Sequence, residues 1–498
     1  MPTESHTRTA KAGLIIRNAR IIDGVGGPSV QGDVAINDDR IVAVGDLATL
    51  QAGLEIDASG KALAPGFIDV HTHDDRALLC EAVLDCKSSQ GVTTVVAGNC
   101  GISLAPLSLS GRPPPPLDLV GEDGELFFAA FGDYLQALDE NPPIVNALCQ
   151  VGHSSLRAGA MDSLDRPASA TEIRQMRARL EAALEAGAAG MSTGLHYAPA
   201  RAATTDEVVE LASALSACGA IHSTHMRDEG AGVLDSLAET FDIGARAGVP
   251  VVISHHKCSG TRNHGRSTET LPVIESARKR QSIALDAYPY VAGSTVLQHD
   301  TAREASRVIV TWSRAQPEAA GRDLSELAAE MGCSEAQAID RLQPAGAIYF
   351  MMDEADVRRI LSYPHTMIGS DGLPHDEFPH PRLWGTFPRV LGHYARDIGL
   401  FSLEEAVRRM TSSPAARFGL KDRGVIRESA FADLVLFDPQ TIIDSATFEA
   451  PTTPAAGIEW TMVNGRMVWR DGEATRDRPG RAIRLQSLHN VGADGPTA

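Results

Sequence analysis

The residues best suited to chemistry in this sequence are polar side chains that follow short, largely apolar runs. One such run, Phe67 to Val70, sits behind a Pro-Gly turn and leads directly into His71 and His73. Residues two apart on a strand point the same way. The two imidazoles can therefore aim at one metal ion, as two ligands of a single site must.

Four more potential ligands follow other apolar runs, namely Cys100, His225, His255 and Asp371. Each alone has an ordinary structural interpretation, such as a small buried thiol or a turn aspartate. Their recurrence at the same place after successive runs predicts one shared metal site. Thiolate and imidazole together favour Zn²⁺. Mg²⁺ and Ca²⁺ are disfavoured because they prefer oxygen ligands.

The elements that must position these residues follow a strand–helix rhythm. Eight candidate strands lie near residues 67–71, 93–97, 144–150, 189–192, 220–224, 250–254, 283–287 and 365–369. Short apolar runs that alternate with helical patterns are typical of a parallel α/β sheet. Eight such strands close a (β/α)8 TIM-like barrel, and active sites of these barrels lie at the carboxyl ends of the strands. The candidate ligands stand at those ends.

Three other stretches have a clear local pattern. Residues 170–186 predict a helix, in which Ser169 and Glu172 form a capping box. Residues 104–143 include four consecutive prolines and predict a loop excursion that covers the barrel mouth. Residues 292–350 are too long for one helix, and their Ala, Glu and Arg content predicts an inserted helical subdomain.

Strand-rich segments flank the predicted barrel on both sides. Residues 1–65 and 420–485 alternate apolar and polar residues between turn clusters, a pattern typical of antiparallel strands. Asn464-Gly465 is a strong hairpin signal. We expect the two segments to join as one composite β-sandwich domain beside a catalytic barrel over residues 66–419. Residues 486–498 are expected to form a disordered tail.

Composition limits the class of protein and its partners. With 498 residues, 43% apolar and 22% charged, the chain is typical of a folded protein of more than one domain. Its 45 Lys and Arg against 64 Asp and Glu give a net charge of −19, which argues against nucleic-acid and anionic-membrane partners. The seven cysteines show no disulfide spacing, and no signal peptide or long apolar run is evident. We therefore expect a cytoplasmic protein.

Short motifs occur in order along the chain. They are His71-Thr72-His73, Asn99-Cys100-Gly101, Ser192-Thr193-Gly194, His225-Met226-Arg227, Ser254-His255-His256-Lys257, Asp286-Ala287-Tyr288-Pro289-Tyr290 and Gly369-Ser370-Asp371-Gly372. Together they resemble the amidohydrolase superfamily and, within it, the N-acyl-D-amino-acid deacylases. The resemblance covers about residues 14 to 470. It implies a zinc-dependent enzyme that hydrolyses the amide of a small-molecule N-acyl-D-amino acid to a carboxylate and a free D-amino acid.

The same resemblance implies a ligand set. A tightly held zinc would lie among Cys100, His225 and His255, and a weaker second metal position would lie by His71 and His73. Cys100 could bridge the two positions, where many relatives use a carboxylated lysine.

The resemblance also implies a general base and a binding site for the substrate carboxylate. Asp371 would take a proton from water and pass it to the leaving nitrogen, which departs poorly as an anion. Lys257, Tyr288, Ser294 and Arg382 match the residues that hold the α-carboxylate, and fixed cations and hydroxyls suit that task.

The side-chain preference is less clear from the sequence. Family members that prefer apolar side chains tend to have an aromatic residue just before the tyrosine matched by Tyr197, and here that residue is His196. Tyr349 and Met352 look suitable to line an apolar pocket. We therefore hypothesise a mixed preference, with His196 tuning the choice between apolar and acidic D-amino acids.

Three alternatives remain open from the sequence. The chain could be an N-acyl-D-glutamate or N-acyl-D-aspartate deacylase. It could also be a hydantoinase-like amide hydrolase, although those enzymes typically use a carboxylated lysine rather than Cys100. A non-catalytic scaffold on the same fold is a third alternative, and loss of metal ligands would mark it.

Overall fold

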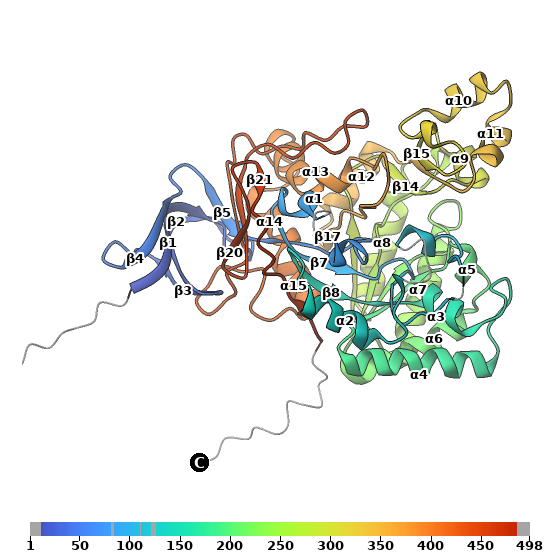
Figure 1. Cartoon of the computed structure of the whole chain (residues 1–498), viewed down its shortest axis with the longest axis horizontal. Coiled ribbons are helices and arrows are strands. Elements are labelled where there is room, and N and C mark those ends of the chain that lie inside the picture. Colours follow the sequence, from blue (N-terminus) through green and yellow to red (C-terminus); the bar gives the residue numbers. More distant parts are fainter. Residues whose placement is uncertain (1–10, 81–83, 110, 121–125, 486–498) are drawn as a thin grey trace, which may run out of the picture.

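Parallel strands occupy the centre of the molecule (Figure 1). In this computed structural model, residues 11–80, 84–109, 111–120 and 126–485 are described. One sheet has the strand order β17-β13-β12-β11-β10-β9, and another has the order β22-β8-β7-β6. Their bounds are β6 (Phe67–Asp69), β7 (Val92–Ala97), β8 (Asn146–Cys149), β9 (Val151–Gly152), β10 (Gly190–Gly194), β11 (Ile221–His225), β12 (Val251–Ile253), β13 (Ile283–Ala287), β17 (Thr366–Ile368) and β22 (Ala482–Ile483). Each of the eight candidate strands is therefore present.

Two connections link the two parallel sheets. On one side β8 leads through a single residue, Gln150, into β9, so that one stretch of chain takes part in both sheets. On the other side Thr72, beyond β6, forms a parallel bridge with Gly372, beyond β17. The Asp371 amide also donates to the His71 carbonyl at 2.7 Å. His71, His73 and Asp371 lie at this second junction, whereas Cys100, His225 and His255 lie at the carboxyl ends of β7, β11 and β12.

Helices follow most of the parallel strands. Their bounds are α1 (Asp85–Ser88), α2 (Phe131–Glu140), α3 (His153–Ala160), α4 (Ala170–Ala186), α5 (Ala198–Arg201), α6 (Thr205–Ala212), α7 (Val233–Ala247), α8 (Ser267–Arg278), α12 (Glu354–Ser362), α13 (Arg382–Arg389), α14 (Leu403–Met410) and α15 (Ser412–Arg417). The prediction for α4 is confirmed, including the capping box of Ser169 and Glu172 and a left-handed Gly187 at its end. The prediction of a loop over 104–143 is wrong for α2, whose Tyr134 and Leu138 are buried.

A mostly antiparallel sheet, in which β1 pairs in parallel with β4 and β5, joins the two ends of the chain. It has the order β21-β20-β19-β18-β5-β1-β2-β3, with β4 paired to β1. The bounds are β1 (Lys11–Ile21), β2 (Val30–Asn37), β3 (Arg40–Gly45), β4 (Gln51–Asp57), β5 (Ala62–Pro65), β18 (Leu434–Phe437), β19 (Ile458–Val463), β20 (Arg466–Arg470) and β21 (Glu473–Ala474). Figure 1 shows the blue and red strands side by side. Hydrogen bonding makes them one continuous sheet rather than the two sheets of a sandwich.

One long-range pairing and one tight turn define this sheet. β5 and β18 lie far apart in the sequence but pair antiparallel, with Leu434 opposite Pro65. Asn464 and Gly465, both at positive φ, form the tight turn between β19 and β20, as their residue types predict.

The segment between β13 and β17 is only partly helical. It contains β14 (Ala292–Val296), α9 (His299–Glu304), β15 (Arg307–Ser313), α10 (Leu324–Glu330), α11 (Glu335–Leu342) and β16 (Ala345–Phe350). The three strands pair antiparallel in the order β14-β16-β15. The expectation of a helical insertion therefore missed a small sheet, because the Ala- and Glu-rich helices dominate the composition between its strands.

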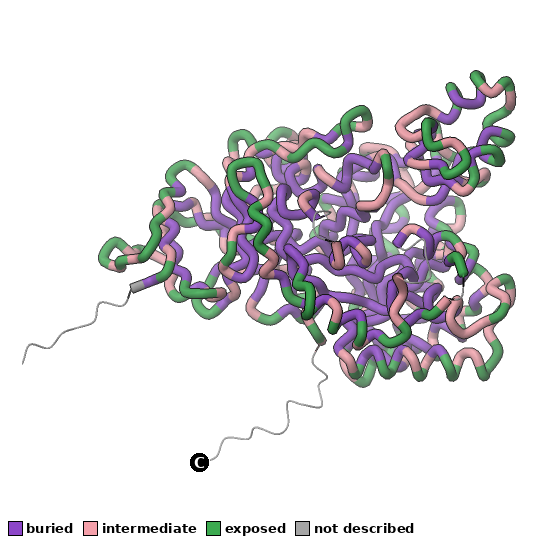
Figure 2. The backbone as a smooth tube through the Cα atoms, in the orientation of Figure 1, coloured by how far each residue is buried: buried purple, intermediate pink, exposed green. Residues whose placement is uncertain are grey.

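The core runs through both parts of the molecule (Figure 2). A large apolar cluster lies between the parallel strands and their helices, and a smaller one lies under the antiparallel sheet. None of the described helices is long and apolar enough to span a membrane. None of the seven cysteines, each in the described part of the chain, forms a disulfide. The predicted tail, 486–498, lies outside the described residues.

Candidate metal centre and active site

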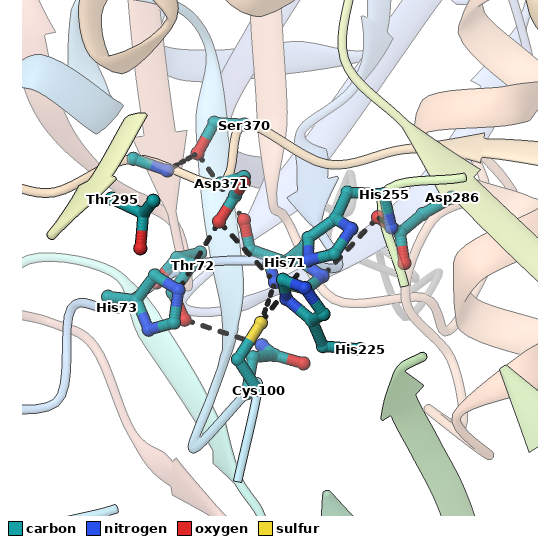
Figure 3. Close-up of polar contacts among 12 residues, drawn as sticks. His71, Thr72, His73, Cys100, His225, His255, Asp286, Thr295, Ser370 and Asp371 are labelled. Atoms are coloured by element: carbon teal, nitrogen blue, oxygen red, sulfur yellow. Dashed lines mark hydrogen bonds and ion pairs between the residues drawn. The ribbon is translucent and has the colours of Figure 1, made fainter. Parts of the chain in front are cut away.

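The six candidate residues from the sequence meet in one buried cluster (Figure 3). The structure groups His71, His73, Cys100 and Asp371, and separately Cys100, His225 and His255. Within each group the potential ligand atoms lie within 4.8 Å of one another. Cys100 belongs to both groups, so its thiol lies between two possible metal positions.

The thiol of Cys100 is surrounded by imidazoles. Its Sγ lies 3.2 Å from His71 Nε2 and 3.4 Å from His255 Nε2. Burial raises the pKa of the Cys100 thiol, but the neighbouring His71 and His255 outweigh it and hold that pKa well below the ordinary value. The group is therefore a thiolate, which is the form that binds metals.

These residues fit a zinc site. The donor set is one thiolate with imidazoles, which Zn²⁺ prefers. The Nδ1 atoms of His73 and His225 are buried and hydrogen-bond to no described residue. Buried polar atoms seldom stay unpartnered in folded proteins, so ligand nitrogens kept free in this way point to a cation.

The backbone at the cluster has an unusual conformation. Cys100, His255 and Asp371 have φ values of 54°, 36° and 50°, in the left-handed region that residues with a Cβ seldom adopt. Such strain concentrates at functional sites. Each of the three lies just past a parallel strand, where the sharp turn directs the side chain into the cluster.

Asp371 lies between imidazoles and a guanidinium. Its Oδ1 is 3.2 Å from His73 Nε2 and 3.5 Å from His71 Nε2, and its Oδ2 is 2.8 Å from Arg382 Nη1. Burial raises the pKa of Asp371, but Arg382 and then His255 hold it well below its usual range. The carboxylate is therefore ionised and able to accept a proton.

Two carboxylates beneath the cluster hold its backbone, and the sequence assigned neither a role. Asp286 Oδ1 accepts from the His255 amide at 2.8 Å and lies 3.4 Å from His71 Nδ1. Asp69 accepts from the Ser370 amide at 2.8 Å and pairs with the buried Lys87 ammonium at 2.8 Å. Both occur in or beside motifs named above, but only the fold shows which atoms they contact.

A cavity of about 540 Å³ opens beside the cluster. Its lining includes eight residues singled out from the sequence: His196, Tyr197, His225, His255, Lys257, Tyr288, Ser294 and Asp371. Tyr349 and Met352 are not among the described residues that line it. The Tyr349 hydroxyl is instead used within the insertion, where it donates to the Val296 carbonyl at 2.9 Å.

The two predicted carboxylate-binding cations face one aromatic ring. Lys257 Nζ lies 5.8 Å from the centroid of the Tyr288 ring, and the Arg382 guanidinium carbon lies 4.5 Å from it. Arg382 also donates to the Ser294 carbonyl at 3.2 Å. The structure therefore brings together all four residues predicted to bind the substrate carboxylate.

His196 and Tyr197 form the wall next to His225. The His196 ring stacks on the His225 ring at 5.3 Å, and Tyr197 lies 4.8 Å from the same ring. The Tyr197 hydroxyl is 3.1 Å from Thr295 Oγ1, which ties this wall to β14. Burial lowers the pKa of His196 to about 4, so this side chain is neutral near pH 7.

Sequence reasoning missed Glu229 entirely. It lies four residues after His225, in the loop after β11, and its carboxylate is buried against Lys257 and His255. The only sign of it in the sequence was an acidic residue four positions after a candidate ligand. Such a residue is usually exposed to solvent, so its type and spacing did not predict a role.

Comparison with known proteins shows the family to which the chain belongs. The model of the amidohydrolase family matches residues 54–469. A D-aminoacylase of Alcaligenes xylosoxydans xylosoxydans is 56% identical over 94% of this chain and 97% of its own length. An N-acyl-D-aspartate deacylase of the same organism is 52% identical over 95% of both chains.

A solved structure extends the comparison. It is N-acyl-D-glutamate deacylase from Bordetella bronchiseptica, complexed with zinc and a phosphonate inhibitor that mimics the tetrahedral intermediate of the reaction. The TM-score is 0.92 at 45% identity, over 95% of this chain and all of that one. The chain belongs to the amidohydrolase family and, within it, to the group of the N-acyl-D-amino-acid deacylases.

Proposed function

We propose that this protein is a zinc-dependent hydrolase that cleaves the amide bond of N-acyl-D-amino acids to a carboxylate and a free D-amino acid. The observation that carries the proposal is the buried Cys100 thiolate, shared between two groups of potential ligands, with the ionised Asp371 beside it. The named activities of the relatives support the same reaction.

The proposed metal site uses residues already described. Cys100, His225 and His255 would hold zinc tightly, and His71 and His73 would provide a weaker second position. When bound, zinc would polarise a carbonyl and lower the pKa of water toward about 7. Proton transfer and substrate binding would be carried out by the protein's own side chains.

Asp371 would move the proton. Its carboxylate accepts a proton from the attacking water and then delivers it to the amide nitrogen, so that the amine leaves uncharged. The contact with Arg382 keeps Asp371 ionised in the free enzyme. This is the role expected of a single carboxylate that acts first as a base and then as an acid.

The substrate would be held by its carboxylate and its flanking groups. Arg382, Lys257, Tyr288 and Ser294 surround the place for the α-carboxylate, and charge-assisted contacts there would fix one end of the substrate. His196 and Tyr197 would form the wall beside the reacting amide. Binding at several points is what allows discrimination between D and L substrates.

The architecture is part of the proposal. We propose that the eight parallel strands close as a (β/α)8 barrel over residues 66–419, which the bridge of Thr72 to Gly372 supports. We propose that residues 1–65 and 420–485 form one flanking β-domain, supported by the pairing of β5 with β18.

A substrate panel tests the function. The metal-free protein would be assayed with N-acetyl-D- and N-acetyl-L-methionine, -aspartate and -glutamate while zinc is titrated in. We expect activity on D substrates that appears with the first equivalent of zinc. Hydrolysis of hydantoin but not of N-acyl-D-amino acids would contradict the proposal, and so would turnover without metal. A non-catalytic scaffold would show no stoichiometric zinc.

A further inference from the structure

Glu229 brings one carboxylate to three functional side chains. Its Oε1 lies 3.0 Å from His255 Nδ1, and its Oε2 lies 2.7 Å from Lys257 Nζ. The same Oε2 is 3.6 Å from His225 Nε2. Glu229 is only 7% exposed, and the Ser259 amide anchors its loop by donating to the Glu229 carbonyl at 2.7 Å.

The two nitrogens of His255 face different surroundings. Nε2 points to the Cys100 thiolate at 3.4 Å, on the side of the proposed zinc. A nitrogen that binds a metal must offer a lone pair, so the proton of a neutral ligand His255 has to sit on Nδ1. Nδ1 must then donate to an acceptor.

Two charged groups compete for that outer nitrogen. Lys257 Nζ, 2.8 Å from Nδ1, is an ammonium and can only donate. The Glu229 carboxylate can only accept. A hydrogen bond from Lys257 therefore favours the tautomer with its proton on Nε2, which cannot bind the metal, whereas Glu229 favours the tautomer that can.

We propose that Glu229 is a positioning residue that sets the tautomer of His255 and holds the Lys257 ammonium away from its Nδ1. The inference rests on the proposed zinc site. One carboxylate thereby connects the zinc ligands with the residue that binds the substrate carboxylate. In the zinc-loaded protein Lys257 pairs with Glu229 Oε2 and the His255 carbonyl, and Nδ1–H donates to Glu229 Oε1.

The test measures zinc affinity, by competition with a chelator, in a double-mutant cycle. Glu229→Gln keeps the shape of the side chain but removes the charge that restrains Lys257. We expect its zinc affinity to fall about 10- to 100-fold, the range typical of lost partners of metal-bound histidine. Adding Lys257→Met removes the competing donor. The zinc affinity of the double variant should therefore lie within about threefold of that of Lys257→Met alone.

Activity assays and a matched control complete the design. Glu239→Gln is the matched control. The Glu239 carboxylate, in α7, pairs with Arg227 at 2.8 Å and contacts no proposed ligand. Its zinc affinity should therefore stay at the wild-type value. Lys257→Met should raise KM while leaving zinc affinity unchanged. If Glu229→Gln binds zinc as wild type does, or if Lys257→Met restores nothing, the inference is wrong. Failure of the wild type to bind zinc would instead refute the proposed function.

Discussion

At the scale of single residues, the proposed centre gives Cys100 and Asp371 different roles. Cys100 lies within both groups of potential ligands, whereas Asp371 lies in only one of them, beside His71 and His73. Removal of each side chain should therefore have a different consequence. Zinc content and turnover can be measured separately, which makes the two roles distinguishable.

Asp371→Ala should abolish most turnover while the tight zinc stays bound. The proposed tight ligands, Cys100, His225 and His255, are untouched, but no carboxylate remains to move the proton. We expect kcat to fall by about 100- to 10,000-fold. Metal analysis beside steady-state kinetics checks this, and near-normal activity would remove Asp371 from the mechanism.

Cys100→Ala should lose the metal itself. No other thiolate lies in either group of ligands, and neutral imidazoles alone hold the cation less well. After dialysis we expect zinc well below one equivalent, measured by elemental analysis against wild type treated in the same way. Full zinc retention would mean that the tight site lies elsewhere.

His196→Phe should shift the side-chain preference toward apolar substrates. The His196 ring stacks on His225 without a charge near pH 7, so a phenyl ring fits the same place and removes only its polar edge. We expect the ratio of kcat/KM for N-acetyl-D-Met over N-acetyl-D-Glu to rise about tenfold. An unchanged ratio would show that His196 does not tune specificity, provided that zinc content also stays the same.

At the scale of elements, contacts between helices fix the position of the loops that follow the strands. A buried cluster provides such contacts between α3 and α6, where the Glu207 carboxylate pairs with Arg157 and lies 3.0 Å from His153 Nε2. Arg157 in turn donates to the carbonyl of Pro199 at 2.7 Å, within α5, which directly follows His196 and Tyr197 in the wall of the cavity.

Glu207→Gln should destabilise the fold in a pH-dependent way. Burial raises the pKa of Glu207, but His153 and Arg157 lower it to about 2. Unfolded Glu titrates near pH 4.3, so this stabilisation is full above that pH and is lost as pH falls toward about 2. A buried Arg157 without a counter-ion should cost about 3–5 kcal/mol near neutral pH.

Chemical unfolding at pH 7 and again near pH 3 measures this difference. The gap between wild type and Glu207→Gln should narrow at the lower pH. A gap that stays constant or widens would contradict the assigned ion pair.

Prediction from sequence succeeded for some of the elements and failed for others. The apolar runs, capping box and Asn-Gly turn depend on residues near one another in the chain, so α4 and the β19–β20 turn were foreseen. Helix α2 and the small sheet of the insertion were missed, because a proline-rich or alanine-rich background hid short segments whose stability comes from tertiary packing.

At the scale of the whole molecule, a buried polar network ties the antiparallel sheet to the parallel one. Asp433 pairs with Arg423, and its Oδ1 accepts from the Asn464 amide at 2.7 Å. Asn464 Nδ2 donates to Asn146 Oδ1, at the start of β8, at 2.8 Å. The C-terminal segment is thus joined to β8, the strand that leads into β9 of the other parallel sheet.

Asp433→Ala should weaken the whole fold. It leaves the Arg423 guanidinium buried without its counter-ion, which costs about 3–5 kcal/mol. Asp438→Ala is the matched control, because its pair with Lys61 is partly exposed and worth at most about 1 kcal/mol. Thermal unfolding of both variants checks the contrast, and equal melting temperatures would show that the network contributes little.

The sequence by itself determined the candidate ligands: a cysteine, histidines and an aspartate, each placed at or just after the end of a strand by local patterns. Only the tertiary structure decided which atoms meet. Glu229, Asp286 and the Asp371–Arg382 contact depend on side chains brought together from different strands and loops. Their contacts arise from the way distant segments converge, which local sequence patterns do not specify.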